Sequence, residues 1–410
     1  MNALFEALLM QAGFNTALVC IGAALLGAAA GGVGTFILLR RRSLASDAAG
    51  HATLPGLAAA FIIMAWLTGD GRWMPALMVG AAISAGLGLA AVHALAARTR
   101  LPEEAAIGAV LSVFFGAGVV LMTVVQVIGT GGQAGIATYL LGSAAGMLRH
   151  EAALIAAMAF ATAVAAFLLR RPLTMLCFDE DFAAMNGVAV RWIDLALSAL
   201  LLAVVVTGLK VVGLVLSVAL SIIPPVAARF WTNRVHHMVI VAAAIGATGG
   251  YVGAAVSSAA HNLPTGAVIV LTLFTLFIVS LLFAPARGLL AGVWRHQVFR
   301  RRVHRRQGLL ALARGEAIYD GFTLRVLRSA GWIRRDGVPT QTGRRAAREA
   351  ARDEALWALH RQRQPGDGAF RYYHRVMPIR AVLPPDVVRD LERQFDLADV
   401  AAAREPRRGA

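Results

Sequence analysis

The sequence predicts an all-α polytopic membrane protein of eight or nine transmembrane helices, followed by a cytoplasmic winged-helix-like domain. Three observations predict this class. Hydrophobic residues make up 58% of the 410 residues, and the mean hydropathy is +0.66, whereas soluble domains are typically about 45–50% apolar. Apolar runs near the ~20 residues that a spanning helix needs recur as far as residue 286. Beyond Pro285 the chain carries 26 arginines against 13 acidic residues, which is most of its net charge of +16.

Nine apolar runs are candidate spans, and they cover 15–39, 53–69, 73–97, 105–129, 150–169, 192–209, 211–230, 238–259 and 265–285. The second run is short. Only Lys210 separates 192–209 from 211–230, so these two runs are either separate helices or one broken span. Proline removes a backbone donor and kinks a helix, so Pro224-Pro225 predicts a kink in the later run. The count is therefore eight or nine.

Small residues in the first run predict close helix packing, because lipid supplies no hydrophobic force between helices. The glycines concerned are Gly27, Gly31, Gly32 and Gly34.

We predict four parts of the chain: a transmembrane domain over 1–288, a basic juxtamembrane linker over 289–306, a winged-helix-like domain over 307–400 and a disordered tail over 401–410. The stretch RHQVFRRRVHRR directly follows the last span. Cytoplasmic segments near span ends are rich in arginine, so this part is expected in the cytoplasm.

The winged-helix prediction rests on the order of elements after the linker. Two helical patterns come first, then a hairpin around Asp336-Gly337, then a long charged helix over 342–362. One more short helix is expected to begin at Pro384-Pro385.

Several catalytic classes are excluded by what the sequence lacks. Lys210 is the single lysine, and no GxxxxGK[ST] loop surrounds it, so the chain has no Walker-type nucleotide site. No HExxH or GxSxG motif occurs either. Cys20 and Cys177 do not make a disulfide framework. We therefore expect a conduit and not an enzyme: a transporter, a channel or the membrane half of a pump.

Asp47 and His51 are two ionisable groups four residues apart, beside an apolar run. Residues at this spacing share one helix face, and a carboxylate with an imidazole suits zinc, manganese or iron. Ionisable groups inside membrane segments are costly and usually face a pathway. The alternative from the residues alone is an interfacial pair in which Ser43 or Asp47 caps the helix.

The run LLRRRSLASDAAGHATLPGLAAAF resembles the signature of the permeases of bacterial manganese, zinc and iron ABC importers, R-R-x-S-L-x-x-D-x-x-x-H-x-x-x-P-G. The matching positions are Arg40, Arg41, Ser43, Leu44, Asp47, His51, Pro55 and Gly56. Further runs are similar in the same order: RTRLPEEAAIGAVLSVFFGAG, FDEDFAAMNGVAVRWIDLAL, GLKVVGLVLSVALSIIPPVAAR and NLPTGAVIVL. The resemblance covers about 1–288.

The resemblance implies a permease in the bacterial inner membrane that translocates Mn(II), Zn(II) or Fe(II) as cargo, with no permanently bound cofactor. It implies a second permease subunit, two cytoplasmic ATP-binding subunits and an extracytoplasmic metal-binding protein as partners. Asp47 and His51 would contact the ion in the path. Many relatives have an aspartate where this chain has Asn262, so Asn262 and the preceding His261 are further candidate ligands.

A docking segment for the ATPase is expected between Asp179 and Val188, in the long polar connection after Arg171. The residues concerned are Asp179, Phe182, Ala183, Ala184 and Gly187, which form the pattern of a short amphipathic helix stopped by the glycine. The alternative is an ordinary solvated loop. His93, His150, His236 and His237 lie near span ends, and we interpret them as structural.

The run LRVLRSAGWIRRDGVPTQTGRRAAREA resembles the winged-helix domain of metal-responsive repressors. Winged helices also mediate protein contacts, and the fold alone does not fix the function. A regulatory contact with the ATPase, apposition to anionic lipid and DNA binding stay open, with DNA the least expected partner. Two alternatives to the permease follow: a membrane-anchored, DNA-binding metal-responsive regulator, and an ion-coupled secondary carrier.

Overall fold

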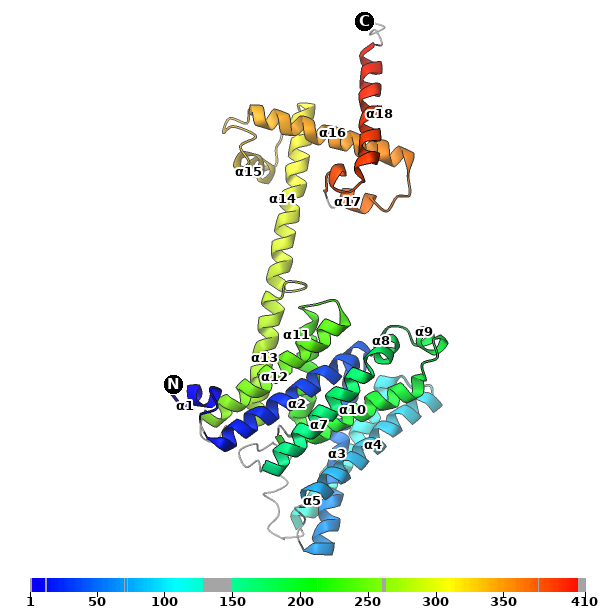
Figure 1. The fold of residues 1–410 in the computed structure, drawn as a ribbon, viewed down its shortest axis with the longest axis vertical. Helices are drawn as coiled ribbons and strands as arrows, with labels where there is room; N and C mark the ends of the chain where they lie inside the picture. The colour runs from blue at the N-terminus through cyan, green and yellow to red at the C-terminus, as the bar shows by residue number, and fades with distance from the viewer. Residues whose placement is uncertain are drawn as a thin grey trace. The chain divides into compact units, whose positions relative to one another are not determined.

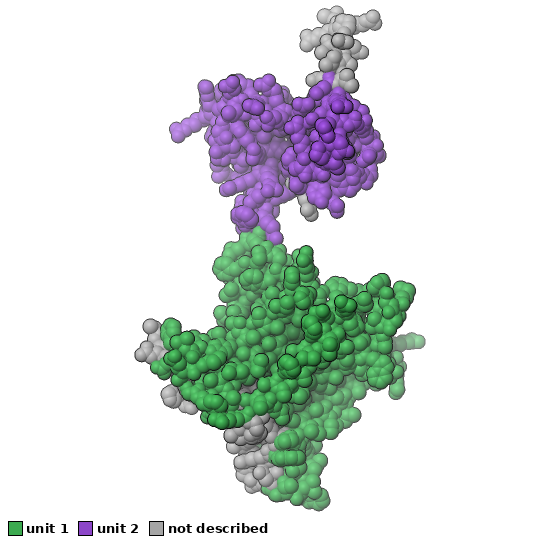
Figure 2. Space-filling model, viewed as in Figure 1, with its two compact units in different colours: residues 1–291 green, residues 292–410 purple. Residues whose placement is uncertain are grey.

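The computed structural model describes residues 2–11, 13–69, 71, 73–127, 149–211, 213–259, 263–374 and 376–404. Within these residues the regular structure is helical, apart from one isolated antiparallel bridge between Ile333 and Pro339. Figure 1 shows the helices along the chain. The chain divides into two compact units, residues 1–291 and 292–410, which Figure 2 colours separately. We describe each unit by itself.

In the first unit the helices are α1 (Asn2–Leu8), α2 (Phe14–Leu39), α3 (Ser43–Thr68), α4 (Met74–Arg98), α5 (Glu103–Val127), α7 (Arg149–Leu168), α8 (Arg170–Phe178), α9 (Glu180–Met185), α10 (Val190–Val211), α11 (Leu214–Arg229), α12 (Val235–Ala259) and α13 (Thr265–Phe283). Among the described residues, seven helices are long and apolar enough to cross a membrane. An eighth arises if α7 and α8, which meet at 64°, form one bent span. The all-α polytopic class is confirmed.

The predicted short span over 53–69 is wrong at its start. Helix α3 begins at Ser43 and continues through Pro55 to Thr68, which gives it 26 residues. Its early turns contain small residues that bury well, including Ala45, Ala48 and Ala49. Asp47 and His51 therefore lie inside a long helix.

The doubtful pair of runs around Lys210 forms two helices. Gly213 lies between α10 and α11 with φ +87°, a left-handed conformation that L side chains rarely adopt. Helix α11 has 16 residues, with Pro224 and Pro225 inside it, and is shorter than the ~20 residues of a full span. Our prediction counted this helix as a span. That accounts for most of the difference between the predicted eight or nine spans and the seven or eight found among the described residues.

The centre of the first unit is α2, which packs against α12, α7, α11 and α10. At the crossing with α12, a Cβ added to Gly27 would meet the Gly246 carbonyl oxygen at 2.1 Å. One turn further, a Cβ on Gly31 would meet the Ala242 carbonyl oxygen at 2.3 Å. The predicted close packing is thus correct at these glycines. Gly32 differs, because the nearest atom to its added Cβ is a Val239 methyl at 4.0 Å.

The second unit contains most of α14 (Leu289–Arg314), then α15 (Gly321–Ser329), α16 (Gln341–Arg363), α17 (Phe370–His374), the 3₁₀ helix η2 (Ile379–Ala381) and α18 (Pro385–Arg404). The predicted hairpin is present as a tight turn. The Arg334 N–H donates to the Val338 carbonyl, the Thr340 N–H donates to the Trp332 carbonyl, and Gly337 has φ +85°. The order helix, helix, hairpin, helix therefore matches the one we expected.

Two predicted boundaries need correction. Residues 289–306 are not a separate linker, because α14 continues unbroken to Arg314 and its later residues pack into the second unit. His304 Nδ1 lies 2.8 Å from the Thr323 hydroxyl, and the Arg305 guanidinium lies over the Trp332 ring. The predicted disordered tail is wrong for residues 401–404, which continue α18. Residues 405–410 lie outside the described part of the chain.

Candidate functional site

Asp47 and His51 lie one turn apart on α3. The Nε2 atom of His51 is 3.4 Å from Oδ1 of Asp47, and the side chains are 21% and 41% exposed for His51 and Asp47 respectively. The edge of the His51 ring contacts Phe115 of α5, with ring centroids 5.1 Å apart. His51 Nδ1 is buried, and none of the described residues forms a hydrogen bond with it. The N-cap of α3 is Arg42, so Asp47 lies in the helix and does not cap it.

Two ligands do not complete a metal shell. The described residues contain no group of three or more His, Cys, Asp or Glu side chains placed to hold one ion. His261 and Asn262, the other candidate ligands, lie outside the described residues. An imidazole and a carboxylate can bind one divalent ion together, so the pair is a partial site.

The turn between α2 and α3 places a non-glycine residue in a left-handed backbone conformation. The Arg42 N–H donates to the Ile37 carbonyl and the Arg41 N–H donates to the Leu38 carbonyl, which is the Schellman arrangement. That arrangement needs a left-handed residue, usually glycine, but here Arg41 occupies it with φ +60°. A non-glycine residue in this region costs of order 1–3 kcal/mol and persists where its surroundings hold it.

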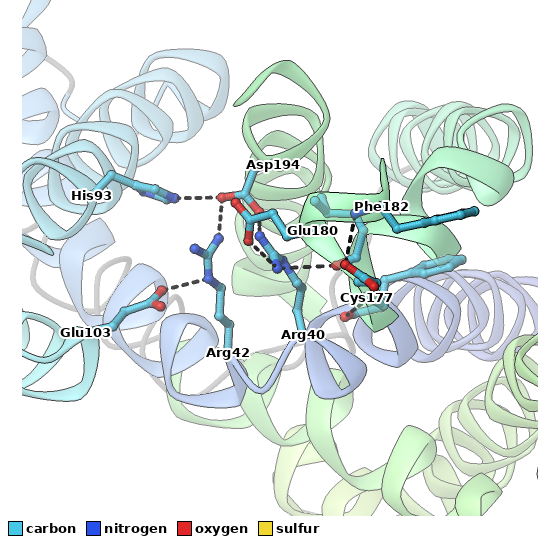
Figure 3. A network of polar contacts seen from close by, with 11 residues as sticks. Arg40, Arg42, His93, Glu103, Cys177, Glu180, Phe182 and Asp194 are labelled. Carbon is cyan, nitrogen blue, oxygen red and sulfur yellow. Dashed lines mark hydrogen bonds and ion pairs between the residues drawn. The ribbon is translucent and has the colours of Figure 1, made fainter. Parts of the chain in front are cut away.

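Asp194 of α10 contacts Arg40 and Arg42, the two arginines that flank this turn, as Figure 3 shows. Its carboxylate forms an ion pair with Arg42 and lies 3.5 Å from Nη2 of Arg40. His93 of α4 approaches the same carboxylate, with Nε2 3.5 Å from Oδ2, and Arg42 Nε also lies 2.7 Å from Glu103 of α5. The Asp194 side chain is only 12% exposed. The buried carboxylate of Asp194 is thus paired with arginine charges. The cluster joins the start of α3 to α4, α5 and α10.

Arg40 extends the cluster to the predicted docking segment. Its Nη1 donates to the Leu176 carbonyl at 3.3 Å and to Glu180 Oε2 at 3.0 Å. The Cys177 thiol lies 3.5 Å from the Phe36 carbonyl, at the end of α2. The turn that begins α3 is therefore tied to α8 and α9 by polar contacts between residues about 140 positions apart.

Residues Glu180–Met185 form helix α9, so the expected short helix is present. Docking on the ATPase stays a prediction. Asp179 caps α9 by accepting from the Phe182 N–H at 2.9 Å, and Gly187 ends it with φ +78°. Ala183 is fully buried, whereas Phe182 is 49% exposed. Ala184 is exposed, and so is the apolar Met185, at 80%. The helix therefore presents apolar side chains outward from an anchored base.

Asp194, Glu103 and Glu180 were not among the predicted site residues, and His93 was interpreted as structural. The available signal was the carboxylate of Asp194 inside the apolar run WIDLAL, since charges inside membrane segments are rare and usually paired. Its partners could not be identified, because they come from distant parts of the chain.

The seven or eight apolar helices, with ionisable groups inside them, define a polytopic α-helical membrane protein. The chain belongs to the ABC 3 transport family, which matches residues 14–284. This is a family of transport permease subunits, which are not themselves enzymes. The predicted resemblance to the permeases of metal importers is confirmed.

Two relatives are similar over most of the chain. A manganese transport system membrane protein, MntC, from Bacillus subtilis is 37% identical over 75% of this chain and 70% of its own length. A zinc transport system membrane protein, TroC, from Treponema pallidum is 39% identical over 68% of this chain and 92% of its own. Among solved structures, PsaBC from Streptococcus pneumoniae in complex with Fab has a chain 28% identical, with a TM-score of 0.59 over 68% of this chain and 95% of that one.

Proposed function

We propose that this chain is the membrane-spanning subunit of an ATP-driven importer for a divalent transition-metal ion, and that Asp47 and His51 contact the ion as it passes. The observation that carries the proposal is the pair itself. A carboxylate and an imidazole lie 3.4 Å apart within a membrane-span helix, and the second imidazole nitrogen is buried with no hydrogen-bond partner in the described part of the chain. The Asp47 charge would offset part of the dication's charge.

A two-ligand site suits cargo better than a resident metal. An ion that moves through must bind well enough to enter and weakly enough to leave. Water, or residues such as His261 and Asn262, would complete the shell. The relatives carry different ions by name: manganese, zinc and, for a Yersinia pestis protein 27% identical over 73% of this chain, chelated iron. The cargo class is therefore Mn(II), Zn(II) or Fe(II).

In this proposal the chain works in a bacterial inner membrane with a second permease subunit, two cytoplasmic ATP-binding subunits and an extracytoplasmic metal-binding protein. Helix α9 would dock on the ATPase through Phe182 and Met185. The Asp179 cap, the buried Ala183 side chain and the hydrogen bond from the Gly187 N–H to the Ala184 carbonyl keep this face in one orientation. The contact between Arg40 and Glu180 supports a mechanical link from that dock to α3.

For residues 292–410 we propose a cytoplasmic winged-helix-like module that regulates the ATPase by contact. The helix order and the tight turn at Gly337 support this fold. DNA is not expected as a partner, since a domain tethered to a membrane reaches only DNA brought there. The comparisons give no support to the membrane-anchored regulator or to the ion-coupled carrier.

The test is metal uptake by a strain that lacks its own high-affinity importers and expresses this chain with its ATPase and binding protein. Asp47→Asn and His51→Gln roughly keep the side-chain size but change the ligand groups. Each should lower uptake roughly tenfold or more, because mutating even the hydrogen-bond partner of a metal ligand commonly costs about 10–100-fold. His237→Gln, at the exposed start of α12, is the matched control and should transport normally. Normal uptake by both pathway variants at normal membrane levels would contradict the proposal. Uptake that survives loss of the ATPase would favour the carrier instead.

A further inference from the structure

A long apolar groove lies over α2, between α7 and α12, and α8 lines one end of it. Its volume is about 950 Å³, near the upper end of ligand pockets in proteins. The groove includes Gly32 of α2, where the missing side chain leaves open space, and the rings of Phe36 and Phe167. It is open to the outside, because Phe167 is 59% exposed and Ile240 of α12 is 54% exposed.

The lining fits alkyl chains. Most of it consists of alanine, valine, leucine, isoleucine, phenylalanine, methionine and glycine, and the described residues that line it include no aspartate or glutamate. The polar residues in the lining are Arg170, Arg171, Thr174 and His236. Arg170, Arg171 and His236 lie where α7 ends, α8 begins and α12 begins. The groove therefore has an apolar body and one basic end.

The length of the groove matches one leaflet of a bilayer. Along α2 it extends from Leu25 to Phe36, which is about 16 Å at 1.5 Å per residue. Half of a hydrocarbon core of ~30 Å is ~15 Å. The basic end lies with the last turn of α2, close in sequence to Arg40–Arg42, and arginine-rich span ends face the cytoplasm.

The two arginines at that end are available to an anion. Among the described residues, neither Arg170 nor Arg171 pairs with a carboxylate. The Arg170 guanidinium lies 4.0 Å above the centre of the Phe167 ring, which orients it along the groove wall. A planar guanidinium binds phosphate oxygens in a bidentate manner. Basic pockets between membrane helices on the cytoplasmic side bind anionic head groups.

We propose that this groove is a binding site for an anionic phospholipid of the cytoplasmic leaflet, with acyl chains along α2 between α7 and α12 and the phosphate at Arg170 and Arg171. The site is separate from the Asp47–His51 pair, and the leaflet assignment rests on the orientation proposed for the chain. A lipid held there would fill the space between α7 and α12. It would also contact α8, which precedes the docking helix α9.

The experiment uses the purified full-length chain in nanodiscs of mixed phosphatidylglycerol and phosphatidylcholine. Each lipid is supplied in turn as a photoactivatable probe with a diazirine on one acyl chain, and labelled peptides are identified by mass spectrometry. The phosphatidylglycerol probe should label α7 and α12 in the groove several-fold more than the phosphatidylcholine probe. Excess unlabelled phosphatidylglycerol should compete with this labelling.

Two variants separate the head-group contact from the apolar surface. Arg170→Gln with Arg171→Gln should lower phosphatidylglycerol labelling roughly 30-fold, which is the loss expected for two arginine contacts near an anionic surface. Arg98→Gln with Arg100→Gln removes a similar pair at the end of α4 and should leave labelling unchanged. Ala163→Trp fills the groove without changing either arginine and should lower labelling by both probes. Size-exclusion profiles report whether each variant folds.

Equal labelling by the two probes, insensitive to the arginine substitutions, would overturn the proposal in favour of non-specific boundary lipid. Absence of labelling by the phosphatidylglycerol probe would also overturn the proposal. A cross-link between two copies of the chain through Ala163→Cys would then show that a second subunit covers the groove.

Discussion

The Arg40 guanidinium joins the start of the candidate metal helix to the candidate docking helix, because its Nη1 lies 3.0 Å from Oε2 of Glu180. The two residues are 140 positions apart. Arg40 itself is only 14% exposed, whereas Glu180 is 55% exposed. One end of this contact is therefore fixed in the protein, and the other lies on a surface that a partner can move.

We predict that Glu180→Gln weakens the coupling of transport to ATP hydrolysis. A pair with one exposed member contributes at most about 1 kcal/mol, so the metal transported per ATP should fall by no more than roughly fivefold. The measurement is uptake and ATPase activity in the same proteoliposomes. Glu104→Gln, which neutralises an exposed carboxylate in the first turn of α5, should leave the ratio unchanged. A ratio equal to that of the wild type in Glu180→Gln would show that this contact transmits nothing.

We predict that Asp194→Asn destabilises the membrane unit. Removing this carboxylate leaves Arg40 and Arg42 largely buried without their shared partner, and breaking a buried pair typically costs 3–5 kcal/mol. The thermal midpoint in detergent, followed by size-exclusion chromatography, should fall clearly. Adding Arg42→Gln should recover part of the loss, because it removes one unpaired cation. A midpoint unchanged by Asp194→Asn alone would refute the cluster's structural role.

A matched pair of glycine substitutions tests the packing of α2. Gly27→Ala places a methyl group 2.1 Å from the Gly246 carbonyl oxygen, so α2 and α12 must move apart. Gly32→Ala meets nothing closer than 4.0 Å, and alanine favours a helix over glycine by about 1 kcal/mol. Gly27→Ala should therefore lower the thermal midpoint, and Gly32→Ala should keep or raise it. The reverse order would contradict the described crossing.

The second unit gives a prediction on pH. Burial raises the pKa of Asp353 above its ordinary value of 3.8, against the opposing effects of the hydrogen bond from the Ile379 N–H and of the nearby Arg306 and Arg380. The folded form therefore holds this proton more tightly than the unfolded form, so the contribution is favourable at low pH and is lost as the pH rises through the folded pKa. Asp353→Asn keeps an acceptor for the Ile379 N–H without the charge, and it should stabilise α16 at neutral pH.

Hydrogen exchange of α16 peptides in the full-length chain measures this effect. The variant should exchange more slowly than the wild type at neutral pH, and the difference should shrink as the pH approaches 3.8, where the wild-type carboxyl is also protonated. Faster exchange in the variant at neutral pH would mean that the carboxylate charge stabilises this unit.

The membrane class and most span positions were predictable, because the cost of exposing polar backbone to lipid imposes long apolar runs that are visible in sequence. The short helix α9 was also predictable, since an N-cap aspartate and a terminal glycine mark its ends locally. The start of α3 was not, because its first turns hold Asp47 and His51, and helix boundaries within polar sequence depend on packing. The unbroken helix α14 was missed for the same reason.

By itself, the sequence determined the family, the order of the helices and the Asp47–His51 pair, because these depend on hydropathy and on spacing along one chain. Only the tertiary structure revealed that Asp194 pairs with Arg40, Arg42 and His93, and that an apolar groove ends at Arg170 and Arg171. The physical reason is that the free energy of a buried charge or an open groove depends on which distant side chains surround it. That neighbourhood exists only after the helices have packed.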